Sequence, residues 1–249
     1  MAREPSNFTE MLAPRADTIG SLLRPPYLLD AKRAFAEDRI SREELQATEN
    51  RAVDEVVALQ EDVGLEVVTD GEMRRDSFQS QMTAAVEGFS EHDLDAFLWG
   101  EWHSDELGDW MVARPELRVV SKLKRRRFLS AHELTYLQTR TKVVPKITLP
   151  SPTLFINFWS EASRDVYGSH DEYLADVVTI LRDEVAELAR LGARYIQIDA
   201  PHYTSLLDPA GREFYERQGW SVDAWLARGI ELENAVMQNQ PDVTFGFHL

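Results

Sequence analysis

Residues that could do chemistry follow six short apolar runs of this 249-residue chain. These residues are Ser21, Asp70, Glu72, Ser121, Lys122, Thr148, Asp199 and His248. Carboxylates and imidazoles are the side chains that most often move protons, pair with cationic groups or bind metal ions. Polar groups at the ends of successive strands are typical of a (β/α) barrel, whose chemistry lies at the carboxyl ends of its strands.

Alternation along each expected strand decides which of these side chains face the same way. Because successive side chains point to opposite faces, residues two apart share a face. The sets that share a face are Val68, Asp70 and Glu72; Lys146 and Thr148; Gln197 and Asp199; and Thr244, Gly246 and His248. In each set a polar residue comes late in the strand, so the sequence predicts one shared polar pocket at one rim.

Asp199 is the most informative of these residues. A carboxylate that ends an apolar strand and precedes Pro201 is not needed to form a turn, and its burial without a partner would be costly. We therefore interpret Asp199 as functional. Asp70 precedes Gly71 and could equally belong to an ordinary turn. His202 could donate a proton or cap a loop.

Strand and helix patterns alternate along the chain in the way that positions such a rim. Strands are expected at 15–20, 65–69, 117–122, 143–149, 194–199 and 243–249. Capping boxes at 41–44 and 169–172 begin two long helices, and further helices are expected at 131–139 and 221–240. Alternation of this kind implies parallel strands with right-handed crossovers. The predicted fold class is therefore α/β, a (β/α)8 TIM-barrel type with about six strand–helix units present.

The expected domain organisation is one barrel domain at 15–249 after a loose leader at 1–14. An acidic, Trp-rich stretch at about 90–114 interrupts the alternation and is interpreted as an insertion, either a hairpin or a lid. A barrel of six strands would leave two unpaired edges. We therefore expect either a chain truncated after its sixth strand or a homo-oligomer in which a second copy covers the open edges.

The charge and composition exclude several classes of partner. A net charge of −16 argues against nucleic acid and anionic membrane surfaces, which both require positive potential. No segment is apolar enough to span a membrane, and the amino terminus has no apolar stretch typical of a secretory signal. The absence of cysteine fits a reducing compartment, so the expected location is the cytoplasm.

Four motifs, at 16–25, 68–75, 149–153 and 195–199, resemble the cobalamin-independent methionine synthase family. The resemblance is greatest to its short single-barrel members, including the related epoxyalkane:coenzyme M transferases. It implies a zinc-dependent thiol alkyltransferase on a (β/α)8 barrel. In that family zinc holds a small-molecule thiol as its thiolate, which attacks the methyl group of a folate-type donor or an epoxide carbon.

The resemblance also implies roles for particular residues. Ile19, Gly20 and Ser21 would hold the amino-acid end of the thiol, and Glu72 and Asp199 would pair with its ammonium group. Either Phe158 or Trp159 would stack on the pterin of the donor. His248 matches the first zinc ligand of a His-x-Cys motif, whose cysteine and later ligands this sequence does not contain. Asp199 and His202 are the candidate catalytic residues.

Two other functions remain open on the sequence. The first is epoxide-to-thiol transfer, for which His202 after Ala200 could protonate the opening epoxide. Arg24, Arg74 or Arg75 could then bind a sulfonate, although Arg74 and Arg75 could equally pair with Asp76 or Glu72. The second is a non-catalytic barrel fragment that binds a small molecule or a partner.

Overall fold

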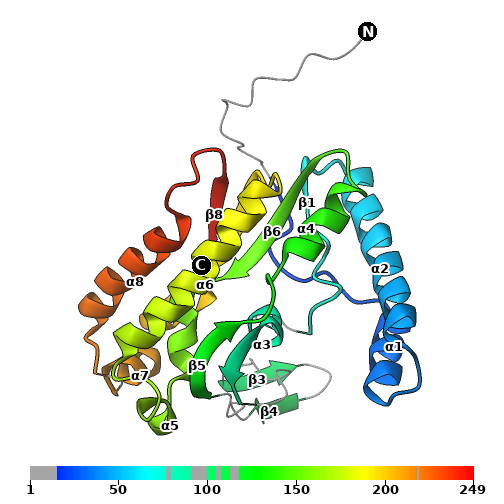
Figure 1. The fold of residues 1–249 in the computed structure, drawn as a ribbon. Coiled ribbons are helices and arrows are strands. Elements are labelled where there is room, and N and C mark those ends of the chain that lie inside the picture. Colours follow the sequence, from blue (N-terminus) through cyan, green and yellow to red (C-terminus); the bar gives the residue numbers. More distant parts are fainter. Residues whose placement is uncertain (1–15, 77–79, 91–99, 105–107, 113–117, 218) are drawn as a thin grey trace.

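A four-stranded parallel sheet forms the centre of the protein in the computed structural model (Figure 1). The structure describes residues 16–76, 80–90, 100–104, 108–112, 118–217 and 219–249. The sheet order is β1-β6-β7-β8. These strands are β1 Val67–Val68, β6 Val144–Pro150, β7 Tyr195–Asp199 and β8 Thr244–His248. All neighbouring pairs are parallel, and Pro150, Asp199 and His248 stand in register at the carboxyl ends.

Helices connect the strands and cover the sheet (Figure 1). The α-helices are α1 Pro26–Ala36, α2 Arg42–Asp62, α3 Ser80–Ala85, α4 Ala131–Gln138, α5 Glu161–Arg164, α6 His170–Arg190, α7 Pro209–Arg217 and α8 Val222–Met237. Two 3₁₀ segments, η1 Pro152–Phe158 and η2 Pro201–Leu207, follow β6 and β7 directly. The capping box at Ser41 and Glu44 begins α2, as predicted. The Ser169 hydroxyl caps α6, but the predicted capping box is incomplete because the Glu172 carboxylate accepts from the Gly168 amide.

The two faces of the central strands differ as the alternation predicts. Ile147, Leu149, Ile196 and Ile198 are buried in a core that they share with apolar residues of α4, α6 and α8. A second, smaller core joins α1 and α2 to β1. The opposite face of β6 and β7 carries polar residues that are also buried: Lys146, Thr148, Gln197 and Asp199. Strands β6 and β7 therefore have an apolar layer on one face and a polar layer on the opposite face.

The strand predicted at 117–122 lies outside this sheet. The structure has β5 Val119–Arg125, which pairs antiparallel with β2 Val86–Phe89. Most of its side chains are exposed or half-buried, whereas a strand inside a parallel sheet is covered on both faces and needs a nearly continuous apolar run. As a result β1 pairs directly with β6, and the described part of the sheet has four strands rather than six.

The strand predicted at 15–20 is also not observed in its described part, residues 16–20. Side chains hold this segment against the polar face of the sheet. Lys146 Nζ donates to Asp17 Oδ2 at 2.8 Å, and Gln197 Nε2 donates to the carbonyl of Ile19 at 2.7 Å. In the described residues the sheet is consequently not closed into a barrel.

The stretch at 90–114 contains an antiparallel strand pair, β3 Gly100–Ser104 and β4 Gly108–Val112. Its other residues lie largely outside the described part of the chain, as does the leader predicted at 1–14. The division into leader, barrel and insertion stays a prediction. In the described part of the chain, no helix has the length and apolar character needed to cross a membrane.

Candidate functional site

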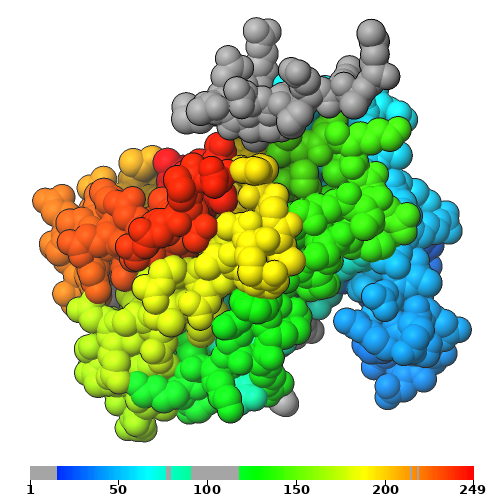
Figure 2. Space-filling model, turned by 45° about the horizontal axis from the view of Figure 1, so that its top comes forward, coloured from blue at the N-terminus to red at the C-terminus, as the bar shows by residue number. Residues whose placement is uncertain are grey.

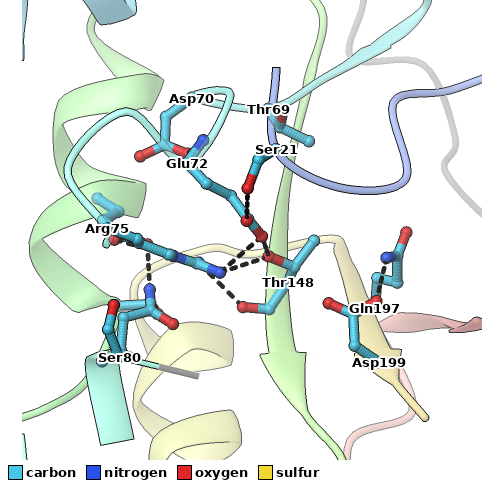
Figure 3. A network of polar contacts seen from close by, with 12 residues as sticks. Ser21, Thr69, Asp70, Glu72, Arg75, Ser80, Thr148, Gln197 and Asp199 are labelled. Atoms are coloured by element: carbon cyan, nitrogen blue, oxygen red, sulfur yellow. Dashed lines mark hydrogen bonds and ion pairs between the residues drawn. The ribbon is translucent and has the colours of Figure 1, made fainter. Parts of the chain in front are cut away.

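Glu72 lies at the centre of a buried polar network at the carboxyl ends of the strands (Figure 3). Its carboxylate accepts a hydrogen bond from Ser21 Oγ at 2.5 Å, from Thr148 Oγ1 at 2.7 Å and from Arg75 Nη1 at 2.9 Å. These donors come from the segment before α1, from β6 and from the loop after β1. The structure therefore brings Ser21 and Glu72 together, although 51 residues separate them in the sequence.

The turn after β1 aims Glu72 at this network. Asp70 Oδ1 accepts a hydrogen bond from the Glu72 amide at 2.9 Å. Gly71 has a φ of 65°, and Glu72 itself has a φ of 56°. A left-handed backbone of this kind is rare for glutamate, so the turn holds Glu72 in an orientation that the local sequence alone would disfavour. Asp70 is therefore a turn residue that also serves the site, because its turn positions the carboxylate of Glu72.

Arg75 compensates the buried charge of Glu72. The guanidinium group also donates to Glu133 at 2.8 and 3.2 Å, and all three of these side chains are almost fully buried. Burial raises the pKa of the nearby Asp70 carboxyl, and the charge of Glu133 raises it further. Glu133 was not among the site residues predicted from the sequence. Its position beside Leu134 on the buried face of a predicted helix was the signal that could have indicated a partnered carboxylate.

Each of the three arginines predicted as possible sulfonate-binding residues has a hydrogen-bond partner within the protein. Arg24 Nη2 donates to the carbonyls of Glu72 and Arg75 at 3.1 and 2.9 Å. Arg74 turns toward α2, where it donates to Asn50 Oδ1 at 2.8 Å. Arg75 pairs with Glu72, as one of the sequence alternatives had it.

Asp199 and His248 form the second part of the site. His248 Nδ1 lies 3.1 Å from Asp199 Oδ1, and Gln197 Nε2 donates to the same oxygen at 2.5 Å. Gln197 Oε1 in turn accepts from Lys146 Nζ at 2.7 Å. Burial raises the pKa of Asp199, against the hydrogen bonds of Gln197 and His248, and the charge of Glu72 adds to the rise. The two buried carboxylates therefore face a common region.

The mouth of this region is open at the segment before α1. Ile19, Gly20 and Ser21 are exposed, and within the described residues their backbone N–H groups make no hydrogen bond. His248 is about one-third exposed at 34%. A ligand that reaches Glu72 and Asp199 would meet these free N–H groups at the same time.

The described residues do not by themselves fit a zinc ion. No group of three or more His, Asp or Glu side chains in the described part of the chain could hold a metal, and the sequence has no cysteine. A catalytic zinc site needs about three protein ligands. The assignment of His248 as a ligand stays a prediction, and we derive no reaction step through a metal.

His202 of η2 belongs to another buried cluster. Its Nε2 is hydrogen-bonded to Thr153 Oγ1 at 2.8 Å, and burial lowers its pKa to about 3. The imidazole is therefore neutral, with Nδ1 left without a hydrogen bond. The same cluster contains Glu233, which accepts from the Thr153 and Ser151 hydroxyls and which the sequence analysis missed. The predicted catalytic role of His202 stays a prediction.

Phe158 and Trp159 are buried at the end of η1. The Phe158 ring lies 5.3 Å from Phe155, and the Trp159 ring lies 4.3 Å from His170. Both rings belong to the large core. Their predicted stacking on a pterin stays a prediction.

Comparison with known proteins agrees with the fold and the site. A solved Listeria monocytogenes protein, described as a candidate vitamin-B12 independent methionine synthase, superimposes with a TM-score of 0.72 over 96% of this chain and 66% of its own, at 20% identity. This likeness shows an α/β fold of the TIM-barrel type. Residues 15–245 match the family described as "Cobalamin-independent synthase, Catalytic domain". The chain therefore belongs to the cobalamin-independent methionine synthase family.

Two curated relatives show how much of the family this chain spans. The chain is 25% identical over 237 residues to the Bacillus subtilis protein YxjH, which is named as uncharacterized. The aligned region covers 94% of this chain and 61% of that protein. The chain is 30% identical over 214 residues to the 5-methyltetrahydropteroyltriglutamate–homocysteine methyltransferase of Thermosynechococcus vestitus. The aligned region covers 86% of this chain and 27% of that enzyme. The chain thus spans less than two thirds of the length of either relative.

Proposed function

We propose that this chain binds the amino-acid end of a small thiol and takes part in transferring a methyl group to its sulfur. The proposed thiol is homocysteine and the proposed donor is a methyltetrahydropteroyl glutamate, in the manner of the homocysteine methyltransferases among its relatives. Family membership supports the class of reaction. The identity of the substrates rests on the site.

The observation that carries the proposal is the pair of buried carboxylates beneath an exposed run of free N–H groups. An α-amino acid is a zwitterion, so a site for it needs acceptors for the ammonium group and donors for the carboxylate. Glu72 and Asp199 supply the acceptors. The N–H groups of residues 19–21 supply the donors.

The pKa of Asp199 predicts how binding depends on pH. Burial raises this pKa, so the carboxyl is more often protonated as the pH falls. Only the ionised form pairs well with an ammonium group. Binding should therefore weaken as the solution is made more acidic, at pH values where the ligand's own ammonium group stays charged.

Calorimetric titration of the whole chain with L-homocysteine and L-methionine tests the proposal. We expect saturable binding that Asp199→Asn weakens by about tenfold or more, because about 1.4 kcal/mol of charge pairing is lost. Asp183→Asn, an exposed carboxylate of α6, is the control and should leave binding unchanged. A ligand without the amino group should bind more weakly.

Failure of both amino acids to bind, or equal binding by Asp199→Asn, would contradict the proposed site. A methyl-transfer assay with 5-methyltetrahydropteroyltriglutamate, homocysteine and added zinc tests the reaction. Binding without methyl transfer would retain the site and overturn the enzymatic part of the proposal, which is the result expected of a non-catalytic fragment.

A further inference from the structure

A second pocket, with a volume of about 330 Å³, lies between α2, the loop after β1, α3 and the start of α4. The surface is indented between the blue and green parts of the chain in Figure 2. Its lining does not include Ser21, Glu72, Asp199 or His248, and it shares only Arg75 and Glu133 with the network described above. The lining does include four arginines: Arg42, Arg74, Arg75 and Arg127.

Arg74 lacks a carboxylate partner in the described part of the chain. Its Nη2 donates to the side-chain amide of Asn50, and its guanidinium group lies 4.6 Å from the centre of the Tyr136 ring. Its Nη1 is buried and has no hydrogen-bond partner among the residues that the structure describes. A buried charged donor without a partner is costly, so this nitrogen has room for an acceptor that the described residues do not supply.

Arg42 and Arg127 are likewise unpaired with any carboxylate of the described residues. Arg42 lies over the Phe35 ring at 5.5 Å. Arg127 Nη1 donates to the backbone carbonyls of Phe128 and Leu129, at 3.0 and 3.1 Å. In a chain with 43 acidic and 27 basic residues, arginines that gather without an acidic partner are unexpected.

Two of the three acidic residues of the same pocket are paired with cations other than these three arginines. Asp76 pairs with Lys32 at 2.7 Å, and Glu133 is held by Arg75. Burial raises the pKa of Glu49, and the charges of Arg74 and Arg42 act against this rise. The lining thus has four arginines against three carboxylates, two of which already have another cation as partner, in a protein whose net charge is −16.

We propose that this pocket binds a small dianionic oxyanion of the phosphate-monoester class through Arg42, Arg74 and Arg127. The planar guanidinium fork matches the oxygens of phosphate in a bidentate geometry. Three unpaired guanidinium groups favour a dianion over a monocarboxylate, because a single negative charge would leave most of the positive charge uncompensated. The volume lies at the small end of the range for ligand pockets. The proposal does not depend on the proposed methyl transfer.

Titration of the whole chain with inorganic phosphate at constant ionic strength, followed by calorimetry, tests this proposal. We expect saturable binding with one phosphate per chain, and binding to acetate that is weaker by about tenfold or more. Arg42→Gln and Arg127→Gln should each weaken phosphate binding by about tenfold, since each removes one bidentate contact.

The chain offers a matched control for each variant. Arg51 lies on α2 with Arg42 but is paired with Glu55 at 2.8 Å, and Arg126 precedes Arg127 but is paired with Glu87 at 2.8 Å. Arg51→Gln and Arg126→Gln should leave phosphate binding unchanged. Circular dichroism shows whether each variant is folded, and Arg42 and Arg127 are both exposed residues.

Three results would overturn the proposal. They are the absence of saturable phosphate binding at constant ionic strength, an equal loss of binding in the control variants, and acetate binding as tight as that of phosphate. Because the lining excludes Asp199, Asp199→Asn should bind phosphate as the parent chain does, so failure here and failure of the amino-acid site give different results.

Discussion

Two buried glutamates of this protein differ in what compensates their charge. Glu72 receives an ion pair from Arg75 as well as two hydroxyl donors. Glu233 receives the hydroxyls of Ser151 and Thr153, and no ion pair to it is found in the described part of the chain. Burial consequently raises the pKa of Glu233 to about 7. The hydroxyl donors of Glu233 lower its pKa but do not offset the larger effect of its burial.

Glu233→Gln should flatten the dependence of the free energy of unfolding on pH. The carboxyl of the folded chain keeps its proton up to about pH 7, whereas in the unfolded chain it loses the proton near its ordinary pKa of 4.5. Folding therefore takes up a proton between these values, and stability falls as the pH rises through this interval, by an amount on the order of 3 kcal/mol. Glu233→Gln has no carboxyl at this position, so the part of the fall in stability that is due to Glu233 is lost.

Urea denaturation at several pH values between the two pKa values measures the effect. Glu231→Gln is the matched control, because Glu231 lies two residues away on α8 but is exposed, and it should retain the slope of the parent chain. An unchanged slope in Glu233→Gln would show that Glu233 is ionised in the folded protein.

Among the elements, those with strong local signals agree with the sequence prediction. Helix α2 has its capping box, and β6, β7 and β8 have alternating apolar residues with a polar residue at the end. The segments at 15–20 and 117–122 were predicted wrongly as strands of the sheet. Both are short, and the second is too polar for a covered strand. The place of the first depends on contacts with Lys146 and Gln197, and that of the second on antiparallel pairing with β2.

Close contact between α8 and η2 gives a prediction for Gly229. In a helix, alanine is ordinarily more stable than glycine by about 1 kcal/mol. A Cβ at Gly229 would lie 2.2 Å from the Tyr203 hydroxyl oxygen, so that ring must move. We expect Gly229→Ala to lower the free energy of unfolding by about 1–3 kcal/mol, the usual cost of overpacking.

Thermal and urea denaturation of Gly229→Ala measure this cost. Ile230→Ala is the control, because Ile230 is the next residue of α8 and is 59% exposed. It should change stability only slightly. A Gly229→Ala variant more stable than the parent would show that helix propensity, and not the contact with Tyr203, dominates at this position.

For the whole molecule, the order of the sheet determines which strands are protected. Strands β6 and β7 each have a neighbour on both sides, whereas β1 and β8 have one neighbour each in the described part of the chain. Phe247 of β8 is 44% exposed. Strands with unpaired backbone groups open more readily and invite pairing with another chain.

Hydrogen exchange measured by mass spectrometry should therefore show slower exchange in β6 and β7 than in β8, by about tenfold or more. Protection of β8 that increases with protein concentration would support the prediction of a homo-oligomer that covers the open edge. Equal protection of β7 and β8 at all concentrations would contradict the order of protection expected from the sheet.

The sequence by itself determined the α/β class, the apolar and polar faces of β6 and β7, and the family, because each follows from local periodicity or from short motifs. It also predicted one rim for Ser21, Glu72, Asp199 and His248, of which the structure pairs Ser21 with Glu72 and His248 with Asp199. Only the tertiary structure decided that β1 pairs with β6, that Arg75 joins Glu72 to Glu133, and that three arginines share a second pocket. These contacts join residues far apart in the chain, so they depend on how helices and loops pack and not on any local pattern.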